Sequence, residues 1–135
     1  MSTRETILAA VASTLVTASV ASGRVYRSRK EQLPTLPAVI VAPQSEEAVE
    51  NALGLADRRI SVGVEVYAKG DTPDNAADAT LAAAWAALFA APDLGLGSDV
   101  QIDPLHGIDW DFEDHDYVRA TLRVTINYRT AIGAM

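Results

Sequence analysis

The residues best suited to chemistry are acids and histidines near the C-terminal end of the chain. Residues 109–116 read Asp-Trp-Asp-Phe-Glu-Asp-His-Asp, and such an oxygen-rich stretch suits hard cations. A twelve-residue calcium loop, however, requires glycine at its sixth position and a carboxylate at its twelfth. The chain has Asp114 and Ala120 there, so this pattern fails. Acids at alternate positions are also typical of the solvent-facing side of a strand.

A site built around histidine is a second possibility. His106 and His115 could combine with Asp103 or Asp116, but their spacing selects no particular metal. The same two histidines equally suit turns at the surface. A metal-dependent enzyme that uses residues 103–116 therefore remains an alternative.

Other catalytic chemistry lacks the residues that it needs. The chain has no cysteine, which excludes thiolate nucleophiles and zinc–thiolate sites. No serine lies in a Gly-x-Ser-x-Gly elbow, and Gly95-Leu96-Gly97 lacks the third glycine and the lysine of a phosphate-binding loop. We predict a protein that is not an enzyme and has no catalytic residue, metal or cofactor.

Composition narrows the class of protein further. The 135 residues, 49% of them apolar, are enough for one domain spanning 1–135 with its own core. A formal charge of −7 repels a phosphate backbone, so we predict no specific nucleic-acid binding. No apolar run is long enough for a membrane span. Arg4 followed by residues 7–12 resembles a secretory signal, but Glu5, Ser13 and Thr14 interrupt that pattern and favour a helix.

Hydrophobic spacing predicts the elements that must position these residues. Apolar residues recur at helical spacing in two segments and alternate with polar ones in several others. The predicted elements are helix 3–20, strand 24–29, strand 38–42, strand 58–68, helix 74–91 with Asp74 as its N-cap, a strand region 99–113 broken at Pro104, and strand 117–129. We therefore expect an α+β fold, with a mostly antiparallel four- to five-stranded sheet and two helices packed on one face.

The other sheet face is predicted to be polar and charged. Strand alternation places five residues on it, namely Arg59, Glu65, Arg119, Arg123 and Arg129, and puts Asp109, Asp111 and Glu113 together on one side of the acidic strand. These charges could simply face solvent or pair within the chain. They could also form subunit or partner interfaces, because guanidinium groups bind carboxylates well and separate acidic and basic stripes suit head-to-tail contact.

Residues 43–57 are predicted to form a mobile loop of functional length. The segment is acidic, with Glu46, Glu47 and Glu50, and Gly54 argues against a stable helix. We predict that these three glutamates take part in assembly.

The order of these local patterns resembles the tail terminators of long-tailed phages, of the lambda-like minor tail protein U type. The resemblance covers nearly the whole chain and is carried by these segments in order: Arg4-Glu-Thr-Ile-Leu8, Leu36-Pro-Ala-Val-Ile-Val41, Arg59-Ile-Ser-Val-Gly-Val-Glu-Val-Tyr67, a helix with Leu81 and Trp85, Asp109-Trp-Asp-Phe112, and Arg119-Ala-Thr-Leu-Arg-Val-Thr-Ile-Asn-Tyr128. No single motif among them is diagnostic.

The resemblance implies a structural role in a virion tail that is assembled in the bacterial cytoplasm. Six copies typically form a ring that ends tail-tube polymerisation and meets a head-side connector protein. The tail tube protein and the connector are then the partners, and DNA passes through the lumen, where an acidic lining would keep it from sticking. The family contributes no catalytic residues, and its loop after the early strand, here residues 43–57, is mobile in the free subunit. A different neck or connector protein of the same particle is the alternative.

Overall fold

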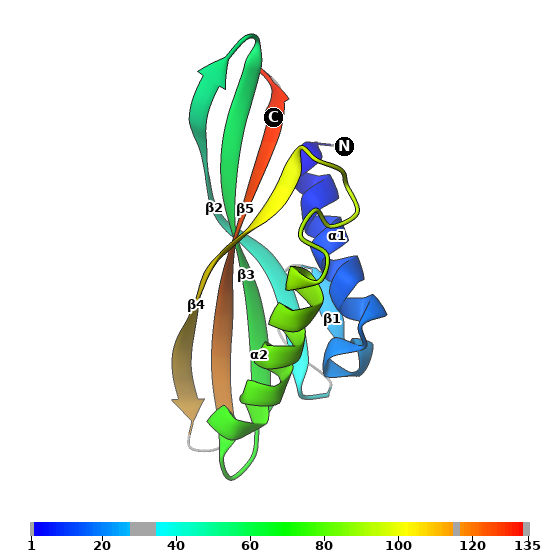
Figure 1. Ribbon diagram of the computed structural model, residues 1–135. Coiled ribbons are helices and arrows are strands. Elements are labelled where there is room, and N and C mark those ends of the chain that lie inside the picture. Colours follow the sequence, from blue (N-terminus) through cyan, green and yellow to red (C-terminus); the bar gives the residue numbers. More distant parts are fainter. Residues whose placement is uncertain (1, 28–34, 115–116, 134–135) are drawn as a thin grey trace.

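The chain forms one twisted sheet with helices on one side, as shown by a computed structural model that describes residues 2–27, 35–114 and 117–133 (Figure 1). The side chains of Glu50, Asn51, Glu113 and Asp114 are outside this description. The strands are β1 (Val25–Arg27), β2 (Ala38–Ala52), β3 (Leu55–Lys69), β4 (Val100–Asp114) and β5 (Tyr117–Ala131), in the spatial order β1-β2-β3-β5-β4. Only the β1–β2 pairing is parallel among these strands. The predicted α+β class and element order are confirmed.

Helix α1 (Thr3–Thr17) begins after the capping residue Ser2. The Ser2 hydroxyl accepts a hydrogen bond from the Glu5 backbone N–H at 3.1 Å, which satisfies one of the free donors of the first turn. The apolar stripe then lies against the sheet, with Ile7, Leu8, Val11 and Leu15 buried. A short 3₁₀ helix, η1 (Val20–Gly23), follows.

Helix α2 (Pro73–Phe89) lies beside α1 on the same sheet face. Its N-cap is Thr72 with Pro73 in the first turn, so the prediction that Asp74 is the cap is wrong by two positions. Proline has no N–H to lose at that position, and its fixed φ suits a helix start. Neither described helix is long and apolar enough to cross a membrane.

The core lies between the two helices and the even-numbered residues of β3 and β5. Buried valines and isoleucines from these strands meet the apolar stripes of α1 and α2, as in Val64 and Ile126. The two central strands are paired along their whole length, from Leu55 with Ala131 to Lys69 with Tyr117. The strict alternation of β5 therefore predicted its buried side correctly.

The prediction of a loop over residues 43–57 is wrong. Strand β2 continues to Ala52 and turns at Leu53 and Gly54, which have φ of 53° and 79°, directly into β3. Register irregularities between Pro43 and Ser45 and between Ala48 and Glu50 shift the pairing, and a bulge of this kind exchanges the faces on which later side chains lie. Regular alternation is lost, although the segment remains paired.

Strand β4 is also more continuous than its sequence indicates. Pro104 does not end it, because the irregular pairing between Ile102 and His106 accommodates the residue at the edge of the sheet. The end of the β2–β3 hairpin and the end of β5 extend beyond both helices at one end of the molecule (Figure 1). This hairpin end, residues 47–57 with 129–132, is thus supported mainly by its own pairing.

Candidate assembly surfaces

The tightest polar cluster joins the start of α1 to β2 and β5. Glu46 accepts two hydrogen bonds from Arg4, with Nε–Oε1 3.0 Å and NH2–Oε2 2.6 Å, and one from the Tyr128 hydroxyl. Arg58 lies 3.5 Å from the same carboxylate and donates to the Thr130 hydroxyl. The side chain of Glu46 is only 14% exposed. A residue predicted to lie in a mobile loop is therefore the centre of a largely enclosed ion pair.

The electrostatics of this cluster follow from its geometry. The hydrogen bonds from Arg4 hold the pKa of Glu46 below its ordinary value, although burial acts in the opposite direction. The same contact raises the pKa of Arg4. Burial, followed by the hydrogen bond to Glu46, raises the pKa of Tyr128 to about 12. The cluster thus stays charged on Glu46 and neutral on Tyr128 near neutral pH.

The predicted acidic and basic stripes lie beside each other in one chain. Arg119 NH2 is 2.7 Å from Asp111 Oδ2, and Arg123 Nε is 2.6 Å from Asp109 Oδ2. The β4–β5 register causes this, because Asp111 pairs directly with Arg119. The Arg123 guanidinium lies over Gly107, where a Cβ would collide with it. Head-to-tail contact requires an acidic stripe and a basic stripe at separate places. The fold instead pairs the two with each other.

We expect the Asp111–Arg119 pair to contribute little to stability. A double-mutant cycle with Asp111→Asn and Arg119→Gln should give a coupling free energy of about 0.2–1 kcal/mol, falling in high salt, because the pair faces water. Chemical denaturation at low and high salt measures it. A coupling well above this range would show that the pair is much less solvated than its 26% and 52% side-chain exposures indicate.

The remaining predicted interface residues also have partners within the chain. Arg129 pairs with Asp57 at 2.7 Å, which lowers the pKa of Asp57, and Glu65 accepts from the Tyr67 hydroxyl at 2.8 Å. Arg59 is held more loosely, 3.3 Å from Asn127 Oδ1 and 3.8 Å from Glu47. The side chains of Glu50 and Glu113 lie outside the described residues.

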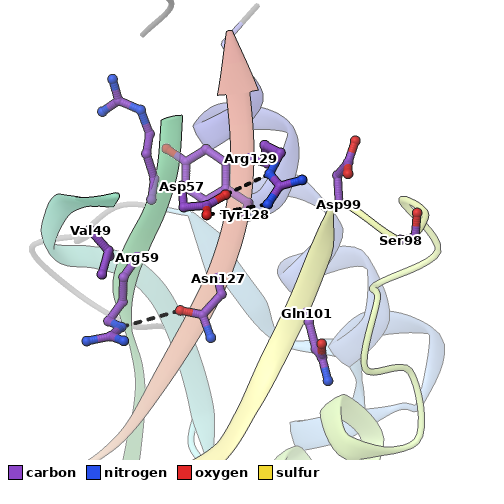
Figure 2. A pocket seen from close by; sticks show the side chains of 10 residues that line it. Val49, Asp57, Arg59, Ser98, Asp99, Gln101, Asn127, Tyr128 and Arg129 are labelled. Atoms are coloured by element: carbon purple, nitrogen blue, oxygen red, sulfur yellow. Dashed lines mark hydrogen bonds and ion pairs between the residues drawn. The ribbon is translucent and has the colours of Figure 1, made fainter. Parts of the chain in front are cut away.

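A shallow cleft of about 350 Å³ lies where β3, β5 and the start of β4 meet (Figure 2). Figure 2 shows Arg59 with Asn127 and Arg129 with Asp57 along its wall. The lining residues are Val49, Asp57, Arg58, Arg59, Ser98, Asp99, Gln101, Asn127, Tyr128 and Arg129. This wall offers hydrogen-bonding groups and charges of both signs.

The candidate metal ligands are not gathered in the part of the chain that the structure describes. No group of three His, Asp or Glu side chains there could hold an ion. His106 stacks on Trp85 with ring centroids 3.8 Å apart, so it packs against α2. His115 and Asp116 lie outside the described residues, and the metal alternative that involves them is not tested by this structure.

Sequence reasoning missed the exposed apolar side chains of β4. Ile108, Trp110 and Phe112 alternate with acids along β4 and share its helix-side face, yet they are 40%, 43% and 58% exposed. The two helices cover the central strands and leave the outer part of this edge strand open. The signal in the sequence was the alternation itself, but alternation does not say which part of a face is covered. Exposed apolar rows on edge strands are typical of interaction surfaces in other proteins.

Comparisons with known proteins identify the fold and nothing finer. No protein-family model and no curated protein matches the sequence. Among solved structures, a chain of the virion of a native gene transfer agent particle is similar, with a TM-score of 0.52 and 19% identity over 92% of this chain and 95% of that chain. At this identity, the likeness shows a shared fold across nearly the whole of both chains.

Proposed function

We propose that the chain is a structural subunit of a phage-type virion, and that it acts without catalysis. The observation that carries this proposal is the shared fold, since the likeness to a chain of the gene transfer agent virion spans both proteins almost from end to end. The exposed apolar row on edge strand β4 supports it, because such a row suits protein contact.

The more specific proposal is that copies form a ring, typically of six, at the end of the tail tube. The ring would stop polymerisation of the tube protein and present a surface to the head-side connector. The sequence resemblance to tail terminators supports this step. The net charge of −7 also suits a ring through which DNA passes without adhering. Another connector or neck protein of the same particle shares the first part of the proposal and differs in its partner.

Tail-tube polymerisation tests the proposal directly. Purified subunit added to polymerising tube protein should shorten the tubes and place a ring at one end, visible by negative-stain electron microscopy. Light scattering after gel filtration should show oligomers that grow with concentration. An unrelated acidic protein of equal size is the control.

The identity of the binding partner distinguishes a tail terminator from another neck or connector protein. Binding to a portal-side connector with no effect on tube length would favour the neck-protein alternative. A subunit that stays monomeric at high concentration and leaves tubes unchanged would contradict the terminator role.

A further inference from the structure

The hairpin end, residues 47–57 with 129–132, is the least supported part of the sheet. It extends beyond both helices (Figure 1), and Val49, Leu53 and Leu55 near its turn are 50%, 100% and 39% exposed. Because these large side chains bury little surface, the hairpin end is held mainly by backbone pairing among β2, β3 and β5. Segments of this kind open at a lower free energy than the core of the same protein.

A polar cluster, the Glu46 cluster, closes the base of the hairpin end. Glu46 directly precedes it on β2, Arg58 directly follows it on β3, and Tyr128 and Thr130 lie at the corresponding level of β5. Arg4 joins them from the first turn of α1, with NH2 2.6 Å from Glu46 Oε2. The cluster thus connects the three strands that continue into the hairpin end to the layer of helices.

Strand β2 is irregular on both sides of Glu46. Its register with β3 shifts between Pro43 and Ser45 and again between Ala48 and Glu50. Bulges of this kind interrupt the ladder and bend the strand. Separation of the strands up to one of these places costs fewer hydrogen bonds than separation within a regular ladder, so the bulges give the hairpin end a boundary next to Glu46.

We propose that the Glu46 cluster is a latch, and that the hairpin end opens as one unit only when this latch breaks. Opening moves Glu46 away from Arg4, because Arg4 stays with α1 on the body of the protein. The Glu46 side chain is only 14% exposed when the latch is closed, so closure requires that its charge be fully paired. This device belongs to the free subunit and does not depend on a role in tail assembly.

Substitution of the latch has a specific consequence for hydrogen exchange. Loss of the Glu46 charge raises the free energy of the closed form relative to every form in which the latch is already broken. Amides of the hairpin end should therefore exchange faster, as should amides at the centre of the sheet, where Val64 pairs with Leu122 and exchange requires global unfolding. If the hairpin end opened with the latch intact, only the centre would exchange faster.

Hydrogen–deuterium exchange of the full chain at pH 7, followed by mass spectrometry, tests the latch. In the wild type, the hairpin end should exchange about tenfold or more faster than the centre of the sheet. Glu46→Gln should accelerate the hairpin end by about 30-fold or more. Arg4→Gln, which breaks the latch from the α1 side, should accelerate it by about tenfold or more, since Glu46 keeps its contacts with Arg58 and Tyr128.

The same substitution at the next residue is the matched control. Glu47 is 68% exposed and its contact with Arg59 is 3.8 Å long, so Glu47→Gln should leave exchange of the hairpin end within about threefold of the wild type. The proposal is supported if Glu46→Gln and Arg4→Gln both accelerate the hairpin end, if the control does not, and if the hairpin end stays faster than the centre in each protein.

Three results would overturn the latch. A hairpin end that keeps its wild-type exchange rate in either latch variant would open with the cluster intact. A hairpin end as slow as the centre in the wild type would open only with the whole protein. Equal acceleration by Glu46→Gln and Glu47→Gln would mean that loss of any carboxylate near this end has the same effect.

Discussion

Replacing Leu15 with alanine should lower the free energy of unfolding by about 2–5 kcal/mol, the largest effect that we expect from a single substitution in this chain. Leu15 is fully buried on the inner face of α1, within the core that α1 shares with the sheet. Removing three side-chain carbons there loses apolar burial and leaves a cavity that close-packed neighbours fill only in part. Urea or thermal denaturation followed by circular dichroism measures the loss.

The next residue along the helix gives the matched control. Val16 is 47% exposed, and alanine has the higher helix propensity, so Val16→Ala should change stability by no more than about 0.5 kcal/mol. A small effect at both positions would mean that α1 is not packed on the sheet, and would undermine the fold on which the assembly surfaces depend.

The fold was predictable in elements where burial of one face alone decides the pattern of apolar residues. In β5, every second residue from Val118 to Tyr128 is buried between the helices and the sheet, so its alternation in the sequence is a direct record of burial. The same holds for the stripe of α1. These elements are long and regular, and each has one covered face.

Prediction from the sequence failed where a β-bulge interrupted the regular alternation of side chains. In β2, the bulge after Pro43 turns the even-numbered Glu46 toward α1, although Val39 and Val41 face the core before it. A carboxylate on the inner side of a strand looks like loop sequence unless its partners are known. Those partners, Arg4 and Tyr128, are 42 and 82 residues away along the chain, which is beyond the reach of local pattern.

The candidate surfaces were predictable only as sets of residues. Sequence periodicity assigned Asp111 and Arg119 to strand faces, but the register decides that they meet each other. Likewise, periodicity grouped Ile108, Trp110 and Phe112, but only the positions of α1 and α2 show that the group is uncovered. Interfaces depend on which groups remain unsatisfied after folding, and that requires the tertiary structure.

The carboxylate of Glu46 leads to the second prediction of large effect. Glu46→Gln should destabilise the protein by about 2–3 kcal/mol at pH 7, because the arginine groups of a largely enclosed cluster lose their shared anion. Glu47→Gln is the matched control. The side chain of Glu47 is 68% exposed and lies 3.8 Å from Arg59, so this substitution should cost no more than about 0.5 kcal/mol. Denaturation of the three proteins in parallel measures both values.

The pH dependence isolates the charge of Glu46 from any change in packing. Because folding lowers the pKa of Glu46, its stabilisation is complete above the unfolded value of about 4.3 and is lost as pH falls through the folded value. Glu5 and Asp57 also have lowered pKa values, but both proteins share those losses. The stability difference between wild type and Glu46→Gln should therefore shrink steadily below about pH 4, where a protonated glutamate resembles glutamine. A difference that stays constant down to acid pH would assign the effect of the substitution to shape, and would show that the ion pair does not hold α1 to the hairpin.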